Sequence, residues 1–447
     1  MRSMKLKTFS MGGVHPPENK LSAGREIREL SPSDVVVIPV SQHLGTPSKV
    51  IVERGDQVKV GQLIARAEGF VSTNIHASVS GKVSKVDIFP DSSGYRRLAV
   101  QIKVNGDEWV ETIDRSGTLV KEISLDAEEI RKRIVEAGIV GLGGATFPTH
   151  VKLTTPRGKK AEYLIVNGVE CEPYLTSDHA LMMERSSALL VGIQIMMKGL
   201  GVEKAILGIE SNKPDAISRM QEITRGTAIS VQGLKVKYPQ GGEKQLVKAL
   251  LNREVPSGGL PIDVGVVVFN VGTVHAAYEA VQKNKPLIER VVTVTGKYLK
   301  QPSNFRVRIG TPVSHLIEQA GGLPEDTAKV INGGPMMGKA LASLDVPVVK
   351  GTSGIVLISN EEARRKAVIQ CIRCTRCVQV CPMGLEPYLM MNLAEKEMFE
   401  RMETERVLDC IECGSCSYTC PSSRPLLDYI RLGKAEVAKL VRSRKAV

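Results

Sequence analysis

The chain has 447 residues, of which 42% are hydrophobic and 24% charged, as expected for several soluble domains rather than one. Its net charge is +12, but only 4% of its residues are aromatic and no recognition motif accompanies the charge, which argues against nucleic-acid binding and favours acidic protein partners. No apolar run approaches the roughly 20 residues of a membrane-spanning helix, and the first residues lack the apolar core of a signal peptide, so we expect a cytoplasmic chain.

Residues 1–20 form an N-terminal extension that contains GGVHPPENK. Two prolines follow His15, so this segment is expected to be extended rather than helical. A single histidine without partner residues makes a weak ligand site. We therefore interpret the segment as an arm held against the rest of the protein, with a ligand role for His15 as the alternative.

Residues 21–125 form the first predicted domain. Its short β-rich runs, separated by Gly, Pro and Asp turns, are VVVIPV, KVIVE, LIARAE, VSGKVSKVDI and AVQIKV. The pattern resembles a biotinyl or lipoyl carrier domain, a β barrel-sandwich hybrid. A carrier needs a lysine at its exposed hairpin tip, and the tip here, AEGFVSTNIHA, has none. We therefore expect this domain to be a scaffold.

Residues 126–285 alternate between strands and helices, which predicts an α/β domain with a largely parallel sheet. The predicted strands are 162–168, 204–210, 233–239 and 264–270, and the predicted helices are 127–138, 178–200, 213–224, 243–252 and 273–282. Residues 286–358 return to short strands around one helix, which favours a small β-grasp domain. Residues 359–447 are helical in pattern and contain most of the cysteines.

Eight of the nine cysteines form an internal repeat, with CIRCTRCVQVCP at 371–382 and CIECGSCSYTCP at 410–421. Each copy has the ferredoxin spacing for two [4Fe–4S] clusters, in which the last cysteine of each loop binds the other cluster. This assigns one cluster to Cys371, Cys374, Cys377 and Cys420, and the other to Cys410, Cys413, Cys416 and Cys381. Zinc is the alternative, but zinc sites ordinarily use two C-x-x-C pairs without the added C-x-x-x-C-P.

Polar residues and glycines gather where three predicted strands end, and ligands bind at this edge of such sheets. GLGGATFPT at 141–149 is rich in glycine but has Thr146 where a dinucleotide fingerprint requires glycine. The strand ends lead into VNGVECEP, YPQGGEKQL and FNVGT, and two of them open helices whose N-termini attract phosphate. The acidic residues here have a second reading, as helix caps. Cys171 is read as a small buried residue, with a redox role as the alternative.

These motifs resemble the flavin- and NADH-binding motifs of the flavoprotein subunit of respiratory complex I. The resemblance implies FMN bound by Gly141, Gly143, Gly144, Lys152, Asn167, Glu170, Tyr238, Gly241, Gly242, Asn270 and Thr273, and NADH met by Phe147, Glu172 and Glu243. Val169 and Gly242 replace acidic residues of that pattern.

The order of arm, barrel-sandwich, flavin domain, β-grasp domain and two ferredoxin loops resembles the RnfC family of the Rnf electron-transport complex. The resemblance implies a peripheral subunit of a ferredoxin:NAD⁺ oxidoreductase on the cytoplasmic side of the inner membrane. Its implied partners are NADH and the other subunits, including a ferredoxin-like one. A cobalamin-reductase-like flavoprotein with the same cofactors and a non-catalytic cluster-binding scaffold are the alternatives.

Overall fold

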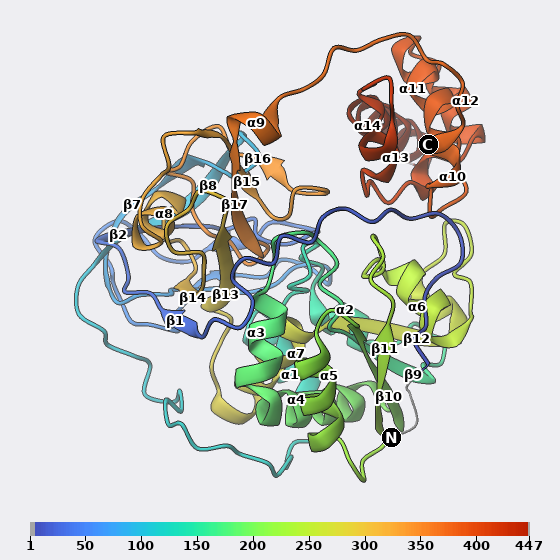
Figure 1. Cartoon of the computed structure of the whole chain (residues 1–447). Helices are drawn as coiled ribbons and strands as arrows, with labels where there is room; N and C mark the ends of the chain where they lie inside the picture. The colour runs from blue at the N-terminus through green and yellow to red at the C-terminus, as the bar shows by residue number, and fades with distance from the viewer. Residues whose placement is uncertain (1–4, 446–447) are drawn as a thin grey trace.

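The computed structural model describes residues 5–445, in which the first domain is built from two small antiparallel sheets (Figure 1). Alternate side chains of its strands point inward, and Val36, Ile38 and Ile102 are fully buried between the sheets. One sheet has the order β2 (Val35–Pro39), β8 (Arg96–Val104), β7 (Gly81–Pro90) and β4 (Gln57–Val58). The other is β3 (Lys49–Val50), β5 (Leu63–Arg66) and β6 (Ile75–His76).

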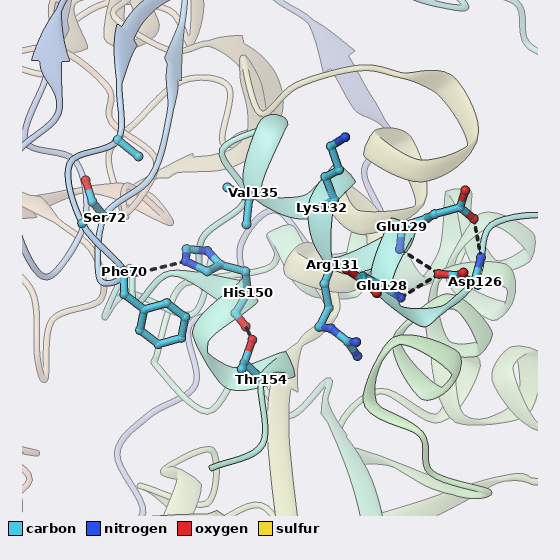
Figure 2. Close-up of a pocket in the computed structure, with 12 residues that line it drawn as sticks. Phe70, Ser72, Asp126, Glu128, Glu129, Arg131, Lys132, Val135, His150 and Thr154 are labelled. Atoms are coloured by element: carbon cyan, nitrogen blue, oxygen red, sulfur yellow. Dashed lines mark hydrogen bonds between the residues drawn. The ribbon is translucent and has the colours of Figure 1, made fainter. Parts of the chain in front are cut away.

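The hairpin tip between β5 and β6 is docked on the α/β domain, as Figure 2 shows around Phe70 and His150. The Nε2 atom of His150 lies 2.9 Å from the carbonyl oxygen of Phe70, and the two rings meet edge to face with centroids 5.8 Å apart. The side chain of Asn74 donates to the carbonyl of Glu136 at the end of α1 (Ala127–Glu136). The tip is therefore a fixed contact between two domains.

Lys350 joins three domains at this contact. Its buried ammonium donates to the carbonyls of Asn74 and Gly138, at 2.9 and 2.7 Å, while its backbone N–H donates to Gln42. Among residues 5–445, no carboxylate lies within ion-pair distance of this ammonium, and burial lowers the pKa of Lys350 from 10.5 to about 7.

This buried ammonium predicts that stability rises with pH. Between about pH 7 and pH 10 the unfolded chain binds a proton that folded Lys350 has released, so the free energy of unfolding should gain up to about 1.4 kcal/mol per pH unit from this group. Urea unfolding of the wild type and of Lys350→Met across this range measures the effect. The stability of the wild type relative to the variant should increase with pH, and parallel curves would contradict the prediction.

The α/β domain has a four-stranded, wholly parallel sheet in the order β11 (Ile229–Leu234), β10 (Lys204–Glu210), β9 (Tyr163–Asn167) and β12 (Val266–Asn270). Asn167 and Asn270 are register partners at the carboxyl ends of their strands. The helices of the domain, besides α1, are α2 (Thr149–Leu153), α3 (Ser177–Glu184), α4 (Ser186–Leu200), α5 (Pro214–Ile223), α6 (Glu243–Leu251) and α7 (Val271–Lys283).

Two elements of this domain differ from the sequence prediction. The strand expected at 233–239 is β11, which ends at Leu234, because the chain then leaves the sheet and Tyr238 pairs with Val14 of the arm. The helix expected at 178–200 is broken at Arg185, where α3 and α4 meet at 98°. Both helices contact α5 and α7, but α3 also packs against β13 and β1, whereas α4 also packs against α1, so tertiary contacts override a continuous helical pattern.

Within residues 5–445, no single helix is long and apolar enough to cross a membrane. The bent pair of α3 and α4 reaches that length and composition only when the two helices are taken together.

The next sheet has six strands and includes a segment from near the N-terminus. Its order is β1 (Ile27–Glu29), β14 (Ser303–Arg308), β13 (Glu289–Thr295), β17 (Gly354–Ser359), β15 (Thr327–Asn332) and β16 (Lys339–Ala340), with α8 (Val313–Gln319) against it. Ile27 pairs with Asn304, so residues 27–29 belong to this sheet and not to the barrel-sandwich domain in which the predicted boundary at residue 21 placed them. A predicted boundary could not include this pairing, because the partners lie far apart in the sequence.

The cysteine-rich domain is helical and stands at one corner of the molecule, joined to the β-grasp domain by an extended segment (Figure 1). Its helices are α10 (Arg376–Gln379), α11 (Pro387–Glu395), α12 (Phe399–Thr404), α13 (Ser415–Thr419) and α14 (Leu426–Lys445), with a short 3₁₀ turn η2 (Val407–Asp409); α9 (Asn360–Ala363) precedes the segment. The N-terminal arm, dark blue in Figure 1, runs between this domain and the α/β domain.

A flavin-type cavity beside two cysteine sets

A cavity of about 470 Å³ opens at the carboxyl ends of β9 and β12, a volume typical of small-ligand sites. Residues from three domains line it. Most belong to the α/β domain, Met337 belongs to the β-grasp domain, and Ile411 belongs to the second cysteine loop. Thirteen of the fourteen predicted cofactor-binding residues line this one cavity, and they are Gly141, Gly143, Phe147, Lys152, Asn167, Glu170, Glu172, Tyr238, Gly241, Gly242, Glu243, Asn270 and Thr273. Gly144 is the exception; it has φ of +108° and faces open space.

The glycine loop is tied back on itself and onto α7. Gly141 donates its N–H to the carbonyl of Phe147 at 2.9 Å, and Leu142 donates to the hydroxyl of Thr273 at 2.8 Å. Asn270 caps α7 by accepting from the N–H of Gly272 at 2.8 Å. The loop thus lies over a helix N-terminus, which suits an anionic ligand without the third glycine of the dinucleotide motif.

The N-terminus of α6 offers a second group of donors beside the cavity. Its N-cap residue is Gly242, which has no side chain with which to bond the first-turn N–H groups. Lys152 lies close by, paired with Glu243 and 3.1 Å from the carbonyl of Val268. Glycine backbone, helix donors and a lysine at one cavity fit a phosphate-bearing flavin.

Two of the predicted ligand carboxylates are already bonded inside the protein. Glu170 accepts from the N–H groups of Asp178 and His179, at 2.7 and 3.2 Å, and so caps α3. Glu172 accepts from the N–H groups of Met336 and Met337, at 3.0 and 2.8 Å, and burial raises its pKa to about 7. For Glu170 the helix-cap reading therefore describes the geometry, and for Glu172 the partner is a loop of the β-grasp domain.

Asp178 is a cavity residue that the sequence analysis did not select. Its carboxylate accepts from the side-chain amide of Asn270 at 2.6 Å, and burial together with the nearby charge of Glu170 raises its pKa to about 7. An acidic residue in the first turn of a helix is common, so the sequence carried no sign of this role. Cys171 is a partly buried thiol that accepts from the N–H of Gly241, and desolvation raises its pKa well above the usual range.

The cysteine repeat is also a structural repeat. Arg373 and Thr375 in the first loop, and Glu412 and Gly414 at the matching positions of the second, all have positive φ angles, between +55° and +76°. Cys381, Cys410, Cys413 and Cys416 surround one apolar cavity, with Cys381 close to each of the other three thiols. We call these four the inner set.

The remaining cysteines are, as a group, more exposed than the inner set. Cys377 neighbours Cys420, and Tyr388 neighbours both Cys371 and Cys377, while Cys374 is exposed. We call Cys371, Cys374, Cys377 and Cys420 the outer set. All eight thiols are free. Each loop therefore lends its last cysteine to the neighbourhood of the other loop.

The inner set is linked to the ligand cavity through Tyr238. The phenolic hydroxyl of Tyr238, which lines the cavity, donates to the carbonyl oxygen of Cys413 at 2.8 Å. Nearby, the side-chain amide of Gln245 donates to the carbonyl of Pro382, the residue after Cys381, at 3.3 Å. One tyrosine thus spans from the flavin-type cavity to the backbone of an inner cysteine.

Comparison with known families identifies each of these parts. Residues 7–107 match the RnfC barrel sandwich hybrid domain, 134–279 the Nuo51 FMN-binding domain, 291–340 the SLBB domain and 364–421 the 4Fe-4S dicluster domain. These matches confirm the predicted fold class and cofactors, and they exclude the zinc reading of the cysteines. The fold also resembles a crystal structure of an NAD⁺-reducing [NiFe]-hydrogenase, with a TM-score of 0.50 and 20% identity over 73% of this chain and 67% of that one.

Relatives match this chain over most of its length. The C-subunit of the proton-translocating ferredoxin:NAD⁺ oxidoreductase complex of Clostridium ljungdahlii is 49% identical over 96% of this chain and 94% of its own length. The Na⁺-translocating counterpart from Acetobacterium woodii is 45% identical over 97% and 98%, and the C-subunit of the ion-translocating oxidoreductase complex of Rhodobacter capsulatus is 43% identical over 86% and 74%. The chain therefore belongs to the RnfC family, the C-subunits of the ion-translocating Rnf oxidoreductase complexes.

Proposed function

We propose that this chain is the peripheral subunit through which electrons pass between NAD(H) and the other subunits of an ion-translocating ferredoxin:NAD⁺ oxidoreductase complex. The observation that carries the proposal is the 2.8 Å hydrogen bond from Tyr238, at the flavin-type cavity, to Cys413 of the inner set. The family assignment favours this function over a cobalamin-reductase-like flavoprotein. Partner subunits would hold the chain at the cytoplasmic side of the inner membrane.

The cavity residues have distinct roles in this proposal. The glycine loop at Gly141 and Gly143, with Asn270 and Thr273 behind it, would hold FMN against the sheet edge. Bound FMN would supply the exchange between a two-electron hydride and single electrons. Asp178 would orient the amide of Asn270, and the β-grasp loop at Met337 would help to exclude water.

The two cysteine sets would each hold one [4Fe–4S] cluster, the inner set next to the cavity and the outer set toward solvent. Because Tyr238 links the cavity to the inner set and the outer set is the more exposed, electrons would pass from the cavity to the inner cluster and then to the outer one. This arrangement needs no acid or base among the residues between the two sets, because only electrons move there.

The test of the whole proposal is the cofactor content of the anaerobically reconstituted full chain. We expect one FMN and about eight iron atoms per chain, and bleaching of both the flavin and the cluster absorbance when NADH is added. A chain that binds clusters but no flavin would instead be the scaffold considered above.

Glu243→Ala is expected to weaken NADH binding while FMN stays bound. Glu243 lines the cavity, pairs with Lys152 and keeps 42% of its side chain exposed, whereas Glu170 and Glu172 are held by backbone N–H groups, so Glu243 can turn to a ligand. Loss of a charge-assisted hydrogen bond should lower the affinity roughly ten- to a hundredfold. NADH titration against flavin absorbance measures this, with Glu254→Ala, whose partner is Lys248 outside the cavity, as the control. Equal affinities for the two variants would remove Glu243 from the site.

Residues 364–376, which we call the exit face, are the proposed docking surface for the ferredoxin-like partner. The segment has five basic and no acidic residues, exposes the apolar side chains of Val368, Ile369 and Ile372 by 55–63%, and contains the exposed Cys374. Exposed apolar side chains bordered by arginine favour a protein interface, and the charge favours an acidic partner.

The exit face predicts a salt-dependent reaction with an acidic bacterial ferredoxin. The double variant Arg364→Glu, Lys366→Glu should slow electron exchange with the reduced ferredoxin by about tenfold at low salt, because steering by charge is reversed. Stopped-flow absorbance measures the rate, and Arg442→Glu, at the exposed end of α14, is the matched control. If both variants react at the wild-type rate, the partner docks elsewhere.

A further inference from the structure

The N-terminal arm contacts both the flavin-type cavity and the first cysteine loop, the two ends of the first step of the proposed electron path. Val14 and Tyr238 form an antiparallel bridge, in which Val14 donates to the carbonyl of Tyr238 at 2.8 Å and Tyr238 donates to that of Val14 at 2.9 Å. On its other side the arm reaches the first cysteine loop, where the N–H of Gly13 donates to the carbonyl of Val380 at 2.8 Å. The arm therefore lies between the cavity and the residue that precedes Cys381.

Two glycines make this close approach possible. A Cβ atom on Gly12 would lie 2.6 Å from the backbone of Cys381 and from the carbonyl oxygen of Val380. A Cβ atom on Gly13 would lie 2.9 Å from the carbonyl oxygen of Tyr238. Both glycines have positive φ angles, +66° and +89°, which other residues rarely adopt. Glycine at these two positions thus allows the backbone of the arm to lie directly against the backbones of Cys381 and Tyr238.

The first and second cysteine loops, which both contribute to the inner set, are held at the junction of the arm with Tyr238. Tyr238 donates to the carbonyl of Cys413 in the second loop, while its backbone partner, the arm, holds Val380 in the first. Val14, Tyr238 and Cys413 form a buried apolar cluster at this junction. The arm and Tyr238 together fix the backbones next to Cys381 and Cys413, which we assign to one cluster.

Side chains also hold the cysteine-rich domain in place: Gln245 donates to the carbonyl of Pro382, Ser257 to the carboxylate of Asp409, and Arg431 to the carbonyl of Met337. The segment 364–370, through which the chain enters the domain, is extended and exposed. The distance from the cavity to the inner set thus depends on non-covalent contacts, among which the arm is the one that touches the backbone of Cys381.

We propose that Gly12 and Gly13 are positioning residues, which set the distance between the flavin cavity and the inner cysteine set. This rests on the proposed function. Electron tunnelling falls steeply with distance, so a small outward shift of the first cysteine loop should slow electron transfer while leaving each cofactor site complete. The role also accounts for the GG of the GGVHPPENK segment, in which His15 itself is exposed.

The test compares Gly12→Ala with Gly24→Ala in the full chain carrying its cofactors. Gly24 is a matched control because it has a similar φ of +72° but nothing within 4 Å of an added Cβ atom. For Gly12→Ala we expect wild-type FMN and iron content and a wild-type rate of flavin bleaching by NADH. Cluster reduction, followed by freeze-quench electron paramagnetic resonance, should be several-fold slower, because the rate of electron tunnelling falls exponentially with distance.

Hydrogen exchange supplies a readout that does not depend on turnover. The amides of Gly13 and of Val380, Cys381, Met383 and Gly384 should exchange faster in Gly12→Ala than in Gly24→Ala. If Gly12→Ala does not fold, Val14→Ala, which trims the packing of the arm against Tyr238 and Cys413 without backbone strain, should show the same changes to a smaller degree.

The outcomes separate the two proposals. The role of the arm would be overturned if Gly12→Ala matched Gly24→Ala both in the rate of cluster reduction and in amide exchange. The same holds for Val14→Ala where it replaces Gly12→Ala. Either result would leave the proposed function intact. A wild-type chain whose flavin is not reduced by NADH would overturn the proposed function itself.

Discussion

Cys381→Ser is expected to remove the iron–sulfur cluster of the second cysteine loop and to leave the cluster of the first loop in place. Although Cys381 belongs to the first loop in sequence, its thiol lies with Cys410, Cys413 and Cys416 around one apolar cavity. Loss of one of four thiolate ligands should unload that cluster, so iron should fall from about eight to about four atoms per chain.

Iron analysis and electron paramagnetic resonance of Cys381→Ser and Cys420→Ser measure this effect. The reciprocal variant, Cys420→Ser, should remove the other cluster, because Cys420 neighbours Cys377. Cys171→Ser, outside both sets, is the control and should keep the iron content of the wild type. If each variant lost the cluster of its own loop instead, the exchange of the last cysteines would be wrong.

Gly143→Val is expected to abolish FMN binding and to leave both clusters assembled. A Cβ atom at Gly143 would meet Asn270 at an ordinary 3.5 Å, and its φ is not in the left-handed region, so the backbone accepts a side chain here. The added methyl groups would fill the cavity beside Asn270, where the flavin is proposed to lie. The effect is therefore steric and confined to the ligand.

Flavin released by acid from purified Gly143→Val, compared with its iron content, measures the effect. Gly117→Val is the matched control, since Gly117 also lacks a positive φ and has nothing within 4 Å of an added Cβ atom. We expect FMN in the control and none in Gly143→Val, with iron equal in both. Stoichiometric FMN in Gly143→Val would mean that the glycine loop only packs against α7.

The parts of the site that the sequence predicted are those that local patterns encode. The cysteine spacing is repeated within a few residues, and the strand ends of a parallel sheet must share an edge, so both could be placed before the structure was known. The partners of Glu170 and Glu172 could not. One lies at the start of α3 and the other in a β-grasp loop, and each depends on how segments pack rather than on neighbouring sequence.

The same limit applies to the elements that were predicted differently. β11 ends at Leu234 because the arm, more than 200 residues away in sequence, takes over the pairing of Tyr238. The break between α3 and α4 accompanies packing partners that are only partly shared, and the apolar spacing of residues 178–200 does not predict it. The contact of Tyr238 with Cys413 likewise joins two domains.

The docked hairpin tip of the first domain has a consequence for how this fold is used. A carrier domain moves between active sites, so its hairpin tip must be mobile and must hold a covalently attached group. Here the tip is held by His150 at Phe70 and by Lys350 at Asn74. Electron transfer between cofactors at fixed distances does not need a domain to move, and fluctuations that lengthen those distances slow it. In this chain, the fold of a mobile carrier domain therefore serves as a fixed part of the scaffold.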